Sequence, residues 1–314
     1  MKASLMSAVL GAAAFVAAAA SDVKTVDVYT RLMTWNIRLA VGVPGAGEEL
    51  WSKRRPGMRA ALNYEVAGRP EALLCFQEVL NSQRLDLAED LAPLGYKHVG
   101  VGRDDGGFKG EFSPIFYRSD AWDLEQNRTY WLSETPDVPS KGWDAALPRI
   151  VTVAQFRHKK TAAPFIYMCT HFDHVGEQAR VEAGRLISKI AAEWSEKSTE
   201  GGRKTPVFLG GDLNVTPDNQ AYKELIAPGN MFDVKHIVPK ELHHGNKMTY
   251  TGFNLPADKF TEIDHIFVKD PSVVKLESFA VLPTWFDDKL YISDHRPVVV
   301  DVVFKSNKVC KARN

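Results

Sequence analysis

An acid and an imidazole stand side by side in Asp294-His295, just before the apolar run Val298-Val299-Val300 near the end of the chain. Burying either group without a partner costs several kcal/mol, so an ordinary core strand would not carry this pair. Four earlier apolar runs also end in polar residues, and a fifth run begins with one. These residues are Asn36, Glu78, His171, Asp212 with Asn214, and, at the start of the fifth run, Asp264. Polar groups repeated at the ends of apolar strands predict one shared site.

The residue types at these strand ends suit the hydrolysis of a phosphoester. Carboxylate and amide oxygens are preferred ligands of Mg²⁺, Mn²⁺ and Ca²⁺, and we expect Asn36, Glu78 and one aspartate to supply them. Asp212 can hold or deprotonate a water molecule, and the amide of Asn214 can donate to a developing negative charge. If the strand continues past Asp212, its alternation places Asn214 on the same side. Histidines add donors for phosphate oxygens and carry protons near neutral pH.

Apolar runs and helical periodicity predict the elements that position these residues. The clearest helix is predicted where apolar residues repeat at helical spacing between Ala183 and Trp194. Shorter helices are expected over 54–66, 82–91 and 219–226, and strand pairs over 112–118 with 121–126 and over 150–157 with 164–171. The first strand pair is expected to be joined by a turn at Ser119-Asp120. Two sheets packed face to face, with helices outside, is the simplest arrangement of these elements.

The first 20 residues predict a secretory signal peptide. Lys2 provides a short charged region, the stretch from Leu5 to Ala20 is apolar and rich in alanine, and small residues precede Ser21. The stretch is short for a membrane anchor, and no later apolar run approaches the length of a membrane span. We therefore expect a secreted protein with no stable membrane insertion, in which residues 21–314 form one domain that works as a monomer.

The three cysteines do not predict a disulfide framework. Cys75 and Cys169 lie within apolar strands, where a free thiol behaves as a small hydrophobic side chain, and Cys310 lies in the tail. A single disulfide bond remains compatible with this count.

Seven short motifs, taken in order, resemble the endonuclease/exonuclease/phosphatase superfamily, which includes DNase I. They are Thr34-Trp35-Asn36, Gln77-Glu78-Val79, Phe116-Tyr117-Arg118, Thr170-His171, Gly211-Asp212-Leu213-Asn214, Ile263-Asp264-His265 and Ser293-Asp294-His295. Each motif is weak alone, but their order and spacing together are highly specific. The resemblance runs from about Leu32 to Phe304. It implies an α/β (α+β) four-layer sandwich, in which two packed mixed β-sheets are flanked by helices in the DNase I-like arrangement.

The resemblance also implies roles for the motif residues. Glu78 is expected to be the principal metal ligand with Asn36 nearby, and Asp294 is expected to bind metal or to orient a histidine. The implied catalytic set is His171, Asp212, Asn214, Asp264, Asp294 and His295. His265, beside Asp264 on the opposite strand face, is expected to be structural. The implied cofactor is Mg²⁺ or Mn²⁺, with Ca²⁺ as an alternative.

Three further residues are candidates for binding the substrate. Arg118 falls where some members of the superfamily contact phosphate. Arg149, before an apolar strand, can hold a phosphate through two hydrogen bonds or can form an ordinary salt bridge. Trp143 lies in a long loop, where it can stack on a sugar or base or can simply pack the loop.

Charge and motif details bear on the class of substrate. Lys plus Arg and Asp plus Glu both total 39, so no bulk positive field gathers nucleic acid. The basic run Lys53-Arg54-Arg55 is interpreted as a solvated helix start. DNase I-like members carry a basic residue after the Gln-Glu motif, where this chain has Val79-Leu80. The balanced charge and the missing basic residue after the Gln-Glu motif both argue against duplex DNA as the substrate.

The sequence therefore predicts a secreted, divalent-metal-dependent phosphoesterase that hydrolyses phosphodiester bonds by in-line attack of an activated water. The expected substrate is a small, glycan-linked or lipid-linked phosphodiester. An extracellular nuclease of the same family, acting on DNA or RNA, is the alternative. A non-catalytic secreted binding protein on this fold is a third interpretation.

Overall fold

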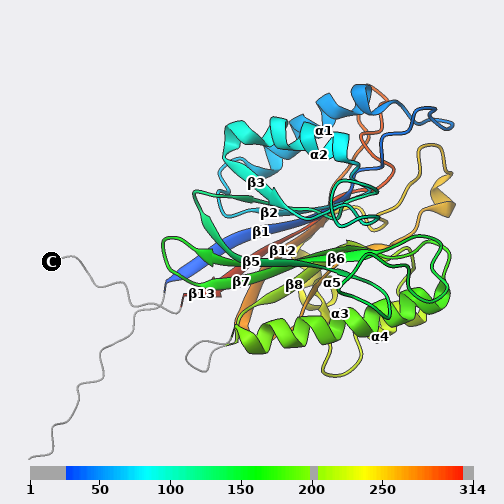
Figure 1. Cartoon of the computed structure of the whole chain (residues 1–314). Helices are drawn as coiled ribbons and strands as arrows, with labels where there is room; N and C mark the ends of the chain where they lie inside the picture. Colours follow the sequence, from blue (N-terminus) through cyan, green and yellow to red (C-terminus); the bar gives the residue numbers. More distant parts are fainter. Residues whose placement is uncertain (1–25, 199–203, 307–314) are drawn as a thin grey trace, which may run out of the picture.

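Two mixed β-sheets pack face to face between two layers of helices, as the sequence predicts (Figure 1). The computed structural model describes residues 26–198 and 204–306. The expected signal peptide and Cys310 lie outside these ranges. Within them, no helix is both long enough and apolar enough to cross a membrane.

The first sheet places three of the polar chain segments at one edge. Its strands, in spatial order, are β10 (His243–Gly245), β12 (Val274–Val281), β13 (Val298–Lys305), β1 (Asp27–Asn36), β2 (Leu73–Gln77), β4 (Ile115–Arg118) and β3 (Tyr96–Val99). Strand β1 runs parallel to β2, and Asn36 is opposite Gln77. It runs antiparallel to β13, and Thr34 is opposite Val298. The end of β1, the end of β2 and the start of β13 therefore meet.

The second sheet brings three more of these residues to its own edge. Its strands are β5 (Trp122–Trp131), β6 (Ile150–His158), β7 (Pro164–His171), β8 (Val207–Asp212), β11 (Asp264–Val268) and β9 (Phe232–Asp233). Strands β7 and β8 are parallel, with His171 opposite Asp212. Strand β11 is antiparallel to β8, with Asp264 opposite Asp212. Strand register alone therefore aligns His171, Asp212 and Asp264.

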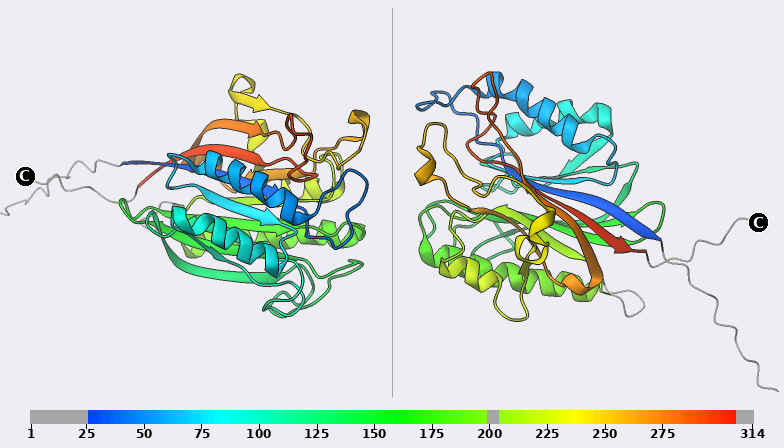
Figure 2. Two further views of the ribbon diagram at one scale, coloured as in Figure 1. Left: turned by 90° about the horizontal axis from the view of Figure 1, so that it is seen from above. Right: turned by 180° about the vertical axis from the view of Figure 1, so that it is seen from behind.

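The helices cover the outer faces of the two sheets. Helices α1 (Trp51–Val66) and α2 (Asn81–Leu91) lie over the first sheet, and α3 (Glu177–Lys197) and α4 (Gln220–Leu225) lie over the second, with the short α5 (Val234–Ile237) beside β11 and β12 (Figures 1 and 2). Along β1, alternate residues Met33 and Trp35 pack beneath α1 and α2. Leu32 belongs to the apolar core between the sheets. This alternation points Asn36 inward, toward the second sheet.

One predicted strand pair is wrong. Strand β4 pairs with β2 and β3 in the first sheet, whereas β5 pairs with β6 in the second. The turn at Ser119-Asp120 therefore crosses from one sheet to the other. Tyr117 of β4 faces Phe156 of β6 across the sandwich, with ring centroids 5.0 Å apart. Closeness in sequence favours a hairpin, but packing of these aromatic faces between the sheets decides the topology. The other predicted pair, β6 with β7, is present as an antiparallel pair.

The basic run at the start of α1 also differs from its interpretation as a solvated helix start. Arg54 is fully buried, and its guanidinium donates to the backbone oxygens of Ile37 at 2.8 Å and Ile292 at 2.9 Å. Arg55 forms ion pairs with acidic residues of α2, among them Asp86 at 2.6 Å. Arg54 therefore joins α1 to the segments that follow β1 and precede β13, and Arg55 joins α1 to α2.

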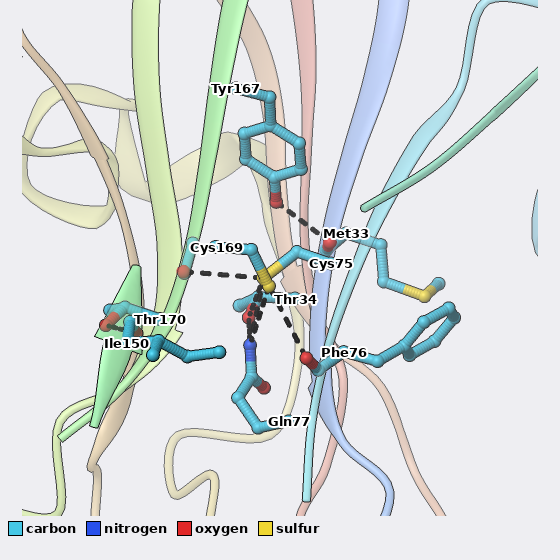
Figure 3. The surroundings of a disulfide bond; sticks show 10 residues. Met33, Thr34, Cys75, Phe76, Gln77, Ile150, Tyr167, Cys169 and Thr170 are labelled. Atoms are coloured by element: carbon cyan, nitrogen blue, oxygen red, sulfur yellow. Dashed lines mark hydrogen bonds between the residues drawn. A yellow bond between two sulfur atoms is a disulfide. The ribbon is translucent and has the colours of Figure 1, made fainter. Parts of the chain in front are cut away.

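A disulfide bond joins the two sheets directly behind the polar edge (Figure 3). Cys75 of β2 is bonded to Cys169 of β7, with Cα atoms 5.5 Å apart, so the single disulfide bond that the cysteine count allows is present. The amide of Gln77 donates to the Cys75 sulfur at 2.9 Å and to Thr34 Oγ1 at 3.0 Å. Cys169 precedes His171 by two residues, so the bond lies next to the strand ends that carry the site.

Removing this disulfide should destabilise the fold. In the double variant with Cys75→Ala and Cys169→Ala, the free energy of unfolding should fall by about 2–4 kcal/mol, because the unfolded chain is no longer cross-linked. The bonded cysteines are 94 residues apart in the sequence. Denaturant unfolding of the wild type and the variant measures the change. Reductant should bring the wild type to the level of the variant and leave the variant unaffected, and a wild type insensitive to reductant under unfolding conditions would contradict the bond.

Candidate active site

His295 is held by a carboxylate on one side of its ring. Its Nδ1 lies 2.9 Å from Asp264 Oδ2, and its Nε2 lies 3.7 Å from Asp212 Oδ2. The indole N–H of Trp35 donates to the His295 backbone oxygen at 2.9 Å and fixes the segment. Burial disfavours the charged imidazole, but Asp264 and Asp212 outweigh it and raise the pKa of His295 well above its ordinary value. His295 is therefore a positively charged donor directed at Asp212.

The Asn36 amide connects carboxylates from both sheets. Its Nδ2 donates to Glu78 Oε1 at 3.0 Å and to Asp212 Oδ2 at 3.0 Å. Its Oδ1 accepts the backbone N–H of Arg38 at 2.9 Å. Asn36 thus serves here as a donor between two acids, and the metal-binding role assigned to it from the sequence stays a prediction.

His171 is the second histidine beside Asp212, near the same carboxylate oxygen as His295. His171 Nε2 lies 3.4 Å from Asp212 Oδ2 and 2.9 Å from Asn214 Nδ2. We expected strand alternation to bring Asn214 to the site if the strand continued. Strand β8 ends at Asp212, so Asn214 reaches the site in another way. The chain turns instead: Asn214 has a φ of 54°, and its backbone N–H donates to Asp212 Oδ1 at 2.8 Å.

Two other residues at the edge share this left-handed backbone conformation. Glu78 and Arg38 both have a φ of 59°. Residues other than glycine and asparagine seldom adopt this backbone conformation. The strain that it causes concentrates at functional sites. The conformation turns Glu78 out of β2 so that its carboxylate accepts from Asn36 and from the backbone N–H of Leu39 at 3.1 Å. Arg38 lies 3.7 Å from the same carboxylate.

The acidic residues fit a divalent cation. Burial, and then repulsion from Glu78, raise the pKa of Asp294 to about 6, although His295 and Arg38 oppose the shift. Asp264 Oδ1 is buried and has no hydrogen-bond partner among the residues described. Ligand atoms of Asp212, Asp264 and His295 all lie within 4.8 Å of one another. Crowded, incompletely paired oxygens of this kind suit a hard cation. Glu78 and Asp294 would hold such a cation.

Sequence reasoning missed Glu111, which faces the second histidine. Glu111 Oε2 lies 3.7 Å from His171 Nδ1, and the Glu111 carboxylate accepts two hydrogen bonds from Arg103, at 2.9 and 2.7 Å. Burial opposes ionisation, but His171, Arg103 and Arg149 lower the pKa of Glu111 to about 2. No local motif marks Glu111. The bridge between Val79 and Phe112, which brings it beside the site, is a contact between distant segments.

Arg149 is buried and lies next to Glu111 and His171. Its Nε is 3.4 Å from Asp173 Oδ2, and its Nη2 is 3.0 Å from His174 Nδ1. Its Nη1 has no hydrogen-bond partner within the described ranges and is buried, and Arg149 lines a cavity of about 10 Å³ together with His171 and Glu111. Arg149 therefore forms a salt bridge with Asp173 through the Nε side of its guanidinium. A substrate contact of Arg149 stays a prediction.

Two other candidates for substrate binding lie differently. Strand β4 is antiparallel to β2, with Tyr117 opposite Leu73, so Arg118 lies at the end of the sheet away from Glu78. The five residues of β2 separate the two ends of the sheet by roughly 15 Å. Arg118 instead pairs with Asp120. The structure therefore does not bring Arg118 to the site. Trp143 is half-buried in the loop between β5 and β6, and its role stays a prediction. His265 pairs with buried Asp233 at 2.9 Å, which agrees with a structural role.

The fold and this arrangement of carboxylates, amides and histidines define a class of phosphoester hydrolases. A model of the Endonuclease/Exonuclease/phosphatase family matches residues 33–295, and the chain belongs to this family. Its members hydrolyse phosphoester bonds with the help of divalent metal ions.

Several relatives cover nearly the whole chain. A Bacteroides thetaiotaomicron mannosyl-6-phosphatase structure is 35% identical, covers 88% of this chain and 100% of its own, and has a TM-score of 0.75. A structure of another endonuclease/exonuclease/phosphatase family protein from this species is 33% identical, with coverages of 88% and 98% and a TM-score of 0.75. An uncharacterized protein of Acanthamoeba polyphaga mimivirus is 27% identical over 267 residues, which are 80% of this chain and 91% of the viral one.

Replacing Glu111 with Gln should destabilise the protein at neutral pH by about 2 kcal/mol, because two buried arginines lose a negative neighbour. The pKa of Glu111 is lowered from 4.5 to about 2, so its contribution is full above pH 4.5 and disappears as the pH falls through about 2. The stability difference between wild type and Glu111→Gln should therefore shrink across this acid range. Chemical unfolding at a series of pH values measures it, with the exposed Glu196→Gln as the control. A difference that stays constant down to pH 2 would refute this assignment.

Proposed function

We propose that this chain is a secreted, divalent-metal-dependent phosphoesterase that hydrolyses small phosphodiesters by in-line attack of water. The position of Asp212 between two histidines carries the proposal. Asp212 Oδ2 lies 3.4 Å from His171 Nε2 and 3.7 Å from His295 Nε2. A carboxylate flanked by two imidazoles can orient a water while both rings donate to phosphate oxygens.

One side chain activates the attacking water, and the others stabilise negative charge. Asp212 holds the attacking water and accepts its proton. Asp264 keeps the His295 ring in place and favours its charged form, so that His295 donates to a phosphate oxygen. Asn214 and His171 supply donors on the other flank. A divalent cation bound by Glu78 and Asp294 supplies neutralisation of negative charge and help for the departing oxygen.

Secretion has two kinds of support. The apolar, alanine-rich stretch before Ser21 has the composition of a signal peptide. The Cys75–Cys169 disulfide belongs to an oxidising compartment, where such bonds form and persist.

A sugar phosphate monoester is the second candidate substrate. The mannosyl-6-phosphatase relative, 35% identical over nearly the whole chain, favours it. Nucleic acid is less well supported, since positive and negative residues balance and Val79-Leu80 stands where DNase I-like enzymes carry a basic group. The D. rerio TDP2 structure with a single-stranded DNA product is 16% identical and supports the fold alone.

Hydrolysis should require both the metal and the charged site. With Mg²⁺ or Mn²⁺ the purified protein should hydrolyse bis-p-nitrophenyl phosphate, and a chelator should abolish the reaction. Glu78→Ala and His295→Ala should each lower kcat/KM about 100-fold or more, because each removes a group that stabilises transition-state charge. Exposed His236→Ala is the matched control and should retain full activity.

A panel of substrates then separates the candidates. It contains sugar phosphodiesters, sugar phosphate monoesters, inositol phosphates, sphingomyelin, RNA and plasmid DNA. Fastest turnover of a small diester supports the first proposal, and fastest turnover of a sugar monoester supports the second. Absence of turnover on every phosphoester with either metal would overturn the assignment as an enzyme and favour a binding protein.

A further inference from the structure

Tyr250 lies beside the site on a backbone that is fixed from both sides. The neighbouring Thr249 accepts the backbone N–H of Asp264 on its Oγ1 at 3.0 Å, and its carbonyl accepts from Arg296 at 2.6 Å. On the other side, the Thr251 N–H donates to the Asp294 carbonyl at 2.8 Å. Tyr250 is thus held between the start of β11 and the segment that carries His295.

The Tyr250 ring packs against the His295 ring. The ring centroids are 4.8 Å apart at 54°, and the two residues form an antiparallel bridge. Tyr250 is half-buried. Burial, and then the charges of Asp294 and Glu78, raise the pKa of the Tyr250 phenol, so its hydroxyl stays a neutral donor beside the acids expected to hold the cation.

The Tyr250 hydroxyl makes no hydrogen bond to any residue in the described part of the chain. By contrast, buried core tyrosines donate hydrogen bonds through their hydroxyls. Tyr167 donates to the Met33 carbonyl at 2.9 Å, and Tyr222 donates to Asp233 at 2.9 Å. A fixed donor that no protein group uses, at the border of a phosphoester site, is available to a substrate.

Aromatic side chains also occur on the two chain segments that carry Tyr250 and Asp294. Phe253, on the same segment, packs against Tyr291 with ring centroids 6.2 Å apart, and Tyr291 packs against Trp285 at 6.1 Å. Tyr291 precedes Asp294 by three residues, and Trp285 is 47% exposed. Aromatic faces with a polar tip nearby match a group that has both C–H surfaces and hydroxyls.

We propose that the Tyr250 hydroxyl donates a hydrogen bond to the leaving group of the substrate and selects phosphoesters whose leaving group is a sugar. The inference rests on the proposed function and names the substrate class of the same site. The position of Tyr250 on the side of Asp294 and Glu78 supports the leaving group as its partner, because the cation held there assists the departing oxygen. A site that supplies a hydrogen bond to a substrate hydroxyl discriminates against esters that lack it.

Tyr250→Phe tests this proposal, because it keeps the ring against His295 and removes only the hydroxyl. Wild type, Tyr250→Phe and the control Tyr64→Phe, whose tyrosine is 78% exposed, are compared on two ester types. The sugar phosphoester turned over fastest in the panel has hydroxyls on its leaving group, whereas the p-nitrophenyl ester of the same phosphate class has none. Tyr250→Phe should lower kcat/KM on the sugar ester about 5- to 10-fold and leave the p-nitrophenyl ester within about twofold. Tyr64→Phe should change neither.

Each other outcome has a distinct meaning. An equal loss on both esters would overturn the proposal and assign Tyr250 to the phosphate or to His295. No loss on either ester, or a wild type that hydrolyses p-nitrophenyl esters but no sugar ester, would also overturn it. A wild type inactive on both ester types would instead contradict the proposed function. Equal melting temperatures of the variants exclude misfolding as the cause.

Discussion

Buried negative charge is the constraint on which the rest of this structure depends. Glu78 and Asp294 come from the first sheet, Asp212 and Asp264 from the second, and all four converge where the strands end. Like charges gathered in a buried place repel one another, and burial together with the charge of Glu78 raises the pKa of Asp294. The protein offsets it with the charged ring of His295, while the incompletely paired oxygens suit a divalent cation. A negatively charged phosphate is accepted more readily when positive groups offset these charges.

Holding these charges together requires rigid support, and the scaffold provides it from several directions. The Cys75–Cys169 bond joins the sheets two residues before His171 and three residues before Glu78. Arg54 joins the segments that follow β1 and precede β13 through backbone carbonyls. The Asn36 amide joins the sheets at the site itself. Catalysis by fixed donors depends on such preorganisation, since groups that must reorganise lose much of their effect.

The sequence predicts the parts of this structure that depend on strand ends. Polar residues that close apolar runs, such as Asn36, Glu78 and Asp212, meet because parallel strands end at one edge, and the sandwich and family are confirmed. Contacts between distant segments were beyond such reasoning. Glu111 reaches His171 through a bridge that no spacing announces. Arg118 was placed by motif alone, although the direction of β4 carries it to the far end of the sheet.

The central claim is that the convergent carboxylates bind a divalent cation, and calorimetric titration tests it most directly. Mg²⁺ or Mn²⁺ is titrated into chelator-treated wild type and into Glu78→Gln, which keeps the size of the side chain and removes its charge. We expect saturable binding to the wild type and binding weakened at least about tenfold in Glu78→Gln. Absence of binding to the wild type, or equal binding to both proteins, would contradict it.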